Sequence, residues 1–191
     1  MRHDLRLDGF RYRLRPVGRS DAAFIVALRT DPELGAFLHP TSGRVEDQEA
    51  WIDAYLERAG DFYFIIEDLT DGEAVGTVGI YDTDRTQAEW GRWLVRKGSP
   101  AAVESALLVY RAAFELLRLE AVFCRTIADN AKVVSFHDSS GARREAVLKD
   151  HFQLRGGPRD AVEHRVDRAL WAGMEPKLGF LARRLAAHRA T

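Results

Sequence analysis

Apolar residues recur along the chain with two different periods, and these periods divide it into strands and helices. Short apolar runs and alternating segments are typical of strands, whereas apolar residues three and four positions apart are typical of helices. The first pattern predicts strands at 10–15, 62–68, 74–81, 88–95, 121–127, 144–154 and 160–168. The second predicts helices at 20–30, 45–58, 101–117 and 131–140, and a helical tail from residue 169.

The order of these elements predicts the fold class. Asp71-Gly72 lies between two predicted strands and is a hairpin signal, and the Gly156-Gly157 pair joins the last two strands in a similar way. The segment 88–127 instead runs from strand through loop and helix to strand, which requires a crossover connection. We therefore expect an α+β domain with a mixed central sheet of about six to seven strands, about four flanking helices and an additional C-terminal helix.

The C-terminal segment differs from the rest of the chain in its charge. It has several Lys and Arg residues and no acidic residue after Glu175, while Leu178, Leu181 and Leu185 recur at helical spacing. We therefore divide the chain into a domain at 1–171 and a basic amphipathic helix at 172–191. A packing helix with a solvated basic face explains this pattern, and a contact with phosphate or nucleic acid is the alternative.

Composition and charge exclude several classes of partner. Lys and Arg total 28 against 29 Asp and Glu, a net charge of −1, so the sequence gives no electrostatic reason to expect a nucleic-acid ligand. No apolar run approaches the roughly 18 residues of a membrane span, and the N-terminus lacks the apolar core of a signal peptide. The single Cys124 excludes an internal disulfide and a cysteine metal cluster, so we expect a cytoplasmic protein without a metal.

The loop at 96–100 is the first candidate for chemistry. It connects a strand to a helix, where free backbone N–H groups and the helix dipole favour an anion. Arg96 and Lys97 add two cations, Gly98 allows close approach of the backbone, and Pro100 suits a helix start. The loop is therefore either an ordinary connection or a phosphate-binding site.

Residues 88–151 resemble the GNAT superfamily of acyl-CoA-dependent N-acyltransferases. Within it they are most similar to the ribosomal-protein N-acetyltransferases and the nucleotide-amino-sugar acetyltransferases. The family's phosphate loop corresponds to the stretch from Lys97 to Ala102, its Asn to Asn130, and the aromatic residue seven positions later to His137, where tyrosine is common. Gly141-Ala142 occupies the position of the family's Gly-Phe pair, and the resemblance continues to about residue 171.

The resemblance implies that acetyl-CoA is the cosubstrate. Its pyrophosphate would bind the amides of residues 97–102, its pantetheine would lie beside strand 88–95, and an amide near Leu94 would polarise the thioester carbonyl. The implied cofactor-binding residues are Leu94, Val95, Arg96, Lys97, Gly98, Ser99, Ala101, Ala102 and Asn130.

The resemblance also implies acid and base catalysis. Glu89 lies in a mostly apolar strand and is the candidate base, with a strand-edge pair to Arg92 as the structural alternative. Asp82 is the second candidate for the base and a candidate substrate contact. His137 is the candidate acid that protonates the leaving thiolate, although it would be structural if it lay on the outer face of a short helix.

The acceptor site would involve His39, in the loop between the first two helices, and Trp93, which is otherwise a core residue. We expect an acetyltransferase acting on a small-molecule amine, either an amino sugar or an aminated natural product. A protein N-terminus or lysine is the alternative acceptor, and a non-catalytic CoA-binding module is a second alternative. Exposed hairpin edges are compatible with a homodimer.

Overall fold

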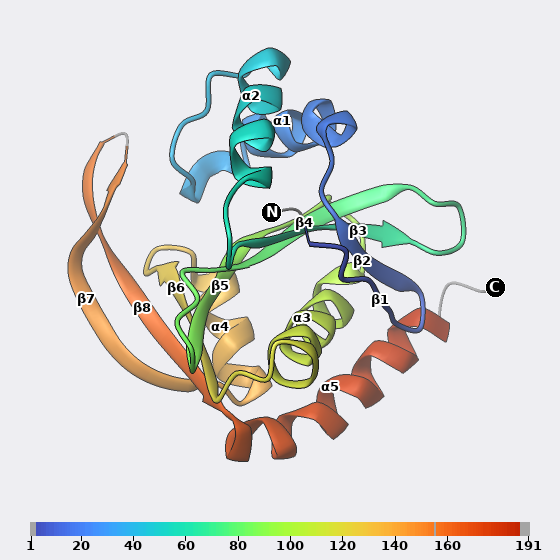
Figure 1. Cartoon of the computed structure of the whole chain (residues 1–191). Helices are drawn as coiled ribbons and strands as arrows, with labels where there is room; N and C mark the ends of the chain where they lie inside the picture. Colours follow the sequence, from blue (N-terminus) through green and yellow to red (C-terminus); the bar gives the residue numbers. More distant parts are fainter. Residues whose placement is uncertain (1–2, 155, 188–191) are drawn as a thin grey trace.

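A computed structural model describes residues 3–154 and 156–187. Its eight strands form one sheet in the order β1-β2-β3-β4-β5-β6-β8-β7 (Figure 1). The strands are β1 (Leu7–Asp8), β2 (Tyr12–Pro16), β3 (Phe62–Asp68), β4 (Ala74–Tyr81), β5 (Gln87–Val95), β6 (Ala121–Ile127), β7 (Arg143–Leu154) and β8 (Gly157–Asp167).

Helices cover both faces of this sheet. Figure 1 shows α1 and α2 above the sheet and α3, α4 and α5 below it. The helices are α1 (Ala22–Thr30), α2 (Val45–Leu56), α3 (Ala101–Arg111), α4 (Ala131–Ser140) and α5 (Arg168–Ala187). The predicted mixed sheet with flanking helices is therefore confirmed. Among the described helices, none is both long and apolar enough to cross a bilayer.

Two apolar clusters hold the layers together. The larger one joins the sheet to α3 and α5, where the rings of Tyr110 and Phe114 lie 5.3 Å and 5.7 Å from Trp171. The smaller one joins the other face to α1 and α2 through residues such as Ile25, Ile52 and Tyr63. The sheet is therefore buried on both faces at its centre, which explains the continuous apolar runs of β3 and β4.

Three details differ from the sequence-based predictions. The sheet has eight strands and not six to seven. The sequence does not predict β1, because this two-residue strand is too short to produce a recognisable pattern. The helix expected at 101–117 leaves α-helical geometry after Arg111 and continues as one wider turn. In α5 the buried stripe consists of Trp171, Met174, Leu178 and Ala182. Two leucines of the predicted apolar face lie outside this stripe: Leu181 is 47% exposed and Leu185 is 38% exposed.

The pairing of β5 changes along its length. It is parallel to β6 only where residues 87–89 face residues 121–123, whereas the opposite edge of β6 pairs with β8 from residue 121 to residue 127. On its other side, β5 has a bulge where Arg92 and Trp93 together oppose one residue of β4. The two central strands therefore diverge beyond Glu89 and open a gap in the middle of the sheet.

A buried carboxylate anchors the first hairpin to α3. Glu104 is 2% exposed, and its Oε1 accepts the backbone N–H groups of Phe10, Arg11 (2.9 Å) and Tyr12 (3.1 Å). Gly9 lies so close that an added Cβ would sit 2.1 Å from the same oxygen. One carboxylate thus satisfies three amides that would otherwise be short of acceptors at the start of β2.

We predict that Glu104→Ala destabilises the protein by about 2–3 kcal/mol, because three amides lose a charged acceptor in a buried site. The measurement is urea denaturation followed by circular dichroism. Glu115→Ala is the control, since Glu115 is half-exposed and, among the described residues, forms only a long ion pair with Arg111. Its effect should be close to zero. Equal midpoints for the two variants would show that this anchor does not stabilise the fold.

Candidate active site

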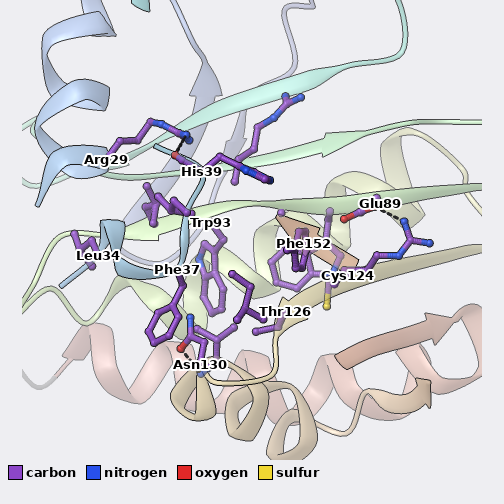
Figure 2. A pocket seen from close by; sticks show the side chains of 18 of the residues that line it. Arg29, Leu34, Phe37, His39, Glu89, Trp93, Cys124, Thr126, Asn130 and Phe152 are labelled. Atoms are coloured by element: carbon purple, nitrogen blue, oxygen red, sulfur yellow. Dashed lines mark hydrogen bonds and ion pairs between the residues drawn. The ribbon is translucent and has the colours of Figure 1, made fainter. Parts of the chain in front are cut away.

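A cavity of about 260 Å³ occupies the gap between the diverging strands. Its floor is formed by residues 89–94 of β5 and 124–127 of β6, and α4 closes one end. The loop after α1 contributes residues 34 and 37–39, and Phe152 approaches from the β7–β8 hairpin. Figure 2 shows Arg29 and His39 at the left of the view and Glu89 at the right, with Trp93 below His39.

Glu89 places a carboxylate on the floor of this cavity. It is 9% exposed, its Oε2 lies 3.0 Å from the Arg125 guanidinium, and Tyr81 donates a hydrogen bond to its Oε1 at 3.3 Å. Burial raises the pKa of Glu89, and the nearby charge of Arg125 offsets only part of that effect. A raised pKa makes the carboxylate a stronger base, as proton transfer from an amine requires.

Arg92 is not the partner of Glu89, contrary to the structural alternative considered from the sequence. The bulge gives Arg92 a φ of +50°, and its guanidinium bonds both oxygens of Asp61 at 2.6 Å and 3.0 Å. It also lies 4.3 Å from the centroid of the Tyr81 ring. The charge partner of Glu89 comes instead from β6, because Arg125 bonds Glu89 with one nitrogen and Glu163 with another.

His137 lies on the inner face of α4, so the outer-face alternative is wrong. It is 2% exposed, lines the cavity and packs 5.2 Å from the Trp90 ring. Its Nε2 is 3.5 Å from Sγ of Cys124, and its Nδ1 has no partner among the described residues. Burial first, and His164 second, lower the pKa of His137 to about 3. These surroundings disfavour the imidazolium that the acid role requires.

Asp138 does not provide the acid partner that could restore a charge on His137. Its carboxylate bonds the Arg144 guanidinium and lies 3.0 Å from Nε2 of His164. These two contacts lower the pKa of Asp138 and direct its charge away from the cavity. His137 is therefore a neutral, buried ring beside the cavity.

Two of the three predicted acceptor contacts reach the cavity. His39 lines it and lies 6.2 Å from the Phe152 ring, and Arg29 donates a hydrogen bond to the His39 carbonyl at 3.1 Å. Trp93 also lines it, held by a hydrogen bond from its Nε1 to the Ser105 hydroxyl at 3.0 Å. Asp82 is exposed at the end of β4 and does not line the cavity.

The loop expected to bind phosphate begins at the end of β5. Gly98 has a φ of +79°, which favours glycine, and the Ser99 amide bonds the Arg96 carbonyl to form a tight turn before α3. Both predicted cations already have acidic partners: Arg96 pairs with Glu73 at 3.1 Å and Lys97 with Glu33 at 2.6 Å. Both pairs are largely exposed, so exchange with another anion costs little.

Backbone alternation decides which β5 amide faces the gap. The amide of Arg96 donates to the Val75 carbonyl of β4 at 2.7 Å. Opposite residues in an antiparallel pair alternate between exchanging both hydrogen bonds and none. The amide of Leu94 therefore faces β4, whereas that of Val95 faces the side from which β6 has diverged. The N–H group that faces the gap is therefore that of Val95, one residue after Leu94, near which the sequence predicted it.

Asn130 and Gly141 mark the two ends of α4. The Oδ1 of Asn130 accepts the amide of Val133 at 3.4 Å, so Asn130 caps the helix, and it also lines the cavity. Gly141 ends the helix at a φ of +100°. Sequence reasoning missed Arg125 and Tyr81 as partners of Glu89, since their proximity depends on which strands are neighbours. Throughout residues 3–154 and 156–187, no group of three His, Cys, Asp or Glu residues could hold a metal ion.

Residues 11–143 match the family model described as an acetyltransferase (GNAT) domain. The match covers most of the chain, and the protein therefore belongs to the GNAT acetyltransferase family. Enzymes of this family use acetyl-CoA. No curated protein matches the sequence.

Solved structures show the same fold. FdhC, described as a nucleotide-linked sugar GNAT, is 29% identical with a TM-score of 0.78, over 96% of this chain and 99% of that one. A GCN5-related N-acetyltransferase from Brucella melitensis is 19% identical with a TM-score of 0.80, over 92% and 84%. Spermidine N-acetyltransferase from Vibrio cholerae, in complex with CoA and spermine, is 18% identical with a TM-score of 0.76, over 85% and 98%. The last two likenesses show the fold alone.

We predict that His137 makes the protein less stable in acid. An unfolded histidine binds a proton below about pH 6.5, whereas the folded His137 does so only near pH 3. The unfolded state therefore takes up the extra proton, and stability falls as pH decreases through this window. His137→Phe should reduce the loss of unfolding free energy between pH 7 and 4.5 by about 2 kcal/mol, measured by urea denaturation at both pH values.

The control for this measurement is His151→Gln, because His151 is exposed on β7. An identical pH dependence in wild type and His137→Phe would mean that His137 is protonated in the folded protein.

Proposed function

We propose that this protein transfers an acetyl group from acetyl-CoA to the primary amine of a small molecule, an amino sugar or an aminated natural product. The observation that carries this proposal is the buried carboxylate of Glu89 on the floor of the cavity between β5 and β6. That carboxylate lies on the strand that leads directly into the Gly98 turn and α3.

The residues at the end of β5 suit the acyl carrier. The tight turn at Gly98 and the N-terminus of α3 present backbone N–H groups where an anionic pyrophosphate would bind, with Ser99, Ala101 and Ala102 beside it. The Val95 amide faces the gap between the strands, and its N–H group would donate a hydrogen bond to the pantetheine arm. Leu94 and Asn130 would line the path of that arm along the cavity.

Acetyl-CoA supplies an activated acyl group as a thioester, and the protein must supply a neutral amine. An alkyl amine has a pKa near 10, so only about 0.1% is neutral at pH 7. Glu89 accepts the amine's proton, and its raised pKa supports this role. Arg125 holds the carboxylate in place, and Glu163 shares the charge of Arg125.

The departing sulfur also needs a proton, and His137 is poorly suited to donate it. His137 lies beside the cavity, but its burial favours the neutral ring, which is a weak acid. Solvent entering the open side of the cavity is the simpler donor. His137 then contributes by packing against Trp90 and closing the end of the site.

The shape of the site favours a small acceptor over a peptide. Residues 34 and 37–39 enclose the cavity from one side and Phe152 from another, whereas a peptide would need an open groove. Release of free thiol from acetyl-CoA with a panel of amines tests the proposal, and a peptide panel tests the alternative acceptor. Absence of thiol release with every amine and peptide would favour a non-catalytic CoA-binding module.

We predict that Lys97→Glu weakens CoA binding roughly tenfold, because it replaces a charge-assisted contact to phosphate with a repulsion. Isothermal titration calorimetry with CoA measures this effect. The matched variant is Glu33→Gln, which removes the partner of Lys97 and leaves the cation in place. Its affinity should equal or exceed that of wild type. Unchanged affinity in a folded Lys97→Glu protein would place the pyrophosphate elsewhere.

We predict that Glu89→Gln lowers kcat/KM at pH 7 on the order of 100-fold, with partial recovery at high pH, where the neutral amine is abundant. Steady-state kinetics from pH 6.5 to 9.5 check this profile. Glu163→Gln is the control: it removes the other carboxylate on Arg125 but does not line the cavity, so its effect should be severalfold at most. A loss in Glu89→Gln that is the same at every pH would assign Glu89 to positioning.

A further inference from the structure

A second cavity, of about 460 Å³, adjoins the one that holds Glu89. It lies between the two N-terminal helices and the sheet, and its walls include Gln48 and Trp51 from α2 and Tyr63 from β3. Arg29 and Arg92 line both cavities, so these two side chains stand at the boundary between them. Arg29 also lines a third cavity of about 370 Å³, beside the loop that follows α1.

Most charges that face these cavities are neutralised within the protein. Arg92 bonds both oxygens of Asp61, and Arg125 bonds Glu89 as well as Glu163. The Arg92–Asp61 pair is neutral, and Arg125 with its two carboxylates has a net negative charge, so neither arginine offers an uncompensated positive charge to a ligand.

Arg29 differs from those two arginines. In the described part of the chain its guanidinium forms no ion pair, and its hydrogen bond goes to the neutral His39 carbonyl. Asp47 faces the second cavity but is exposed on α2, and the Asp31 carboxylate accepts the amides of Glu33 and Leu34. Neither acid pairs with Arg29, so an uncompensated positive charge faces all three cavities.

The position of Arg29 is suited to hold an anion. It lies in the last turn of α1, where the helix dipole favours a cation and helps to keep the guanidinium in place. A guanidinium has a fork of N–H donors that matches the oxygens of carboxylates and phosphates. Its half-buried side chain has also lost part of its water, so a ligand oxygen would replace hydrogen bonds that the protein does not provide.

We propose that Arg29 binds an anionic group of the acceptor, a phosphate or a carboxylate, while the acceptor's amine lies near Glu89. This inference rests on the proposed function, since it assigns the acceptor class of the same site. Gln48, Trp51 and Thr41 provide polar and aromatic walls for the part of the acceptor around the anion. A polycationic amine is disfavoured, because it would bring further positive charge to Arg29.

The test compares acceptors that share one ring and one amine. Glucosamine, glucosamine 6-phosphate and glucosaminuronic acid differ only in a hydroxyl, a phosphate or a carboxylate at one end. Wild-type kcat/KM should be higher for one or both of the charged sugars than for glucosamine, and the larger value identifies the anion. Spermidine serves as the cationic comparison and should be the poorest acceptor.

Arg29→Gln should reduce the preference for the charged sugar by 10- to 100-fold, mainly through KM for that sugar. Arg29→Lys should keep part of the preference, because it retains the charge without the fork. Arg44→Gln is the matched control: Arg44 is a nearby arginine whose side chain is 70% exposed and lines none of the three cavities. The control should leave the preference unchanged.

Three results would overturn the inference. They are equal kcat/KM for all three sugars in wild type, an unchanged preference in Arg29→Gln, and a rise in KM for acetyl-CoA without a change in preference. The last result would assign Arg29 to the cofactor instead.

If no amine is acetylated, the proposed function fails, and the inference is decided by binding. Calorimetric titration of glucosamine 6-phosphate and of inorganic phosphate should then show binding to wild type that Arg29→Gln loses. Equal binding, or none to wild type, would overturn the inference as well.

Discussion

The layout of the site follows from the divergence of β5 from β6. The two strands share three residue pairs and then separate, because β6 continues its ladder with β8 while β5 follows β4 through a bulge. A sheet interior would normally be filled by paired backbone, so the separation exposes backbone groups of β5 in the middle of the protein. Those groups, and the cavity beside them, define where a cosubstrate and an amine can meet (Figure 2).

The protein keeps the Glu89 carboxylate buried and still basic by dividing the charge of its partner. An isolated carboxylate in the gap would be costly, and a strong cation alone would lower its pKa. Arg125 is shared between Glu89 and Glu163, so only part of its charge offsets the burial of Glu89. At the other boundary of the site, Asp61 neutralises Arg92, whereas no acid among the described residues neutralises Arg29.

Local sequence predicted much of the fold. The apolar runs at 62–68, 74–81 and 121–127 and the capped helix at 131–140 appear with the predicted bounds, because each has a strong pattern and clear ends. The two-residue β1 has no such pattern. The leucine face of the last helix was also predicted incorrectly at Leu181 and Leu185, because burial depends on where α3 and the sheet end, and helical spacing does not contain that information.

For the site, the residue types and their order could be predicted from local sequence: Glu89 on a strand, a Gly98 turn, the helix that follows, and Asn130 at the next helix start. These depend on short-range chemistry, namely propensity, capping and backbone freedom. Which charged side chains meet depends on the tertiary structure. Arg125 lies 36 positions from Glu89 and Glu33 lies 64 from Lys97, so neither pairing has a local signal. Burial of His137 depends on β5, β6 and β8 packing around one ring, and its pKa follows from that environment and not from its place in a motif.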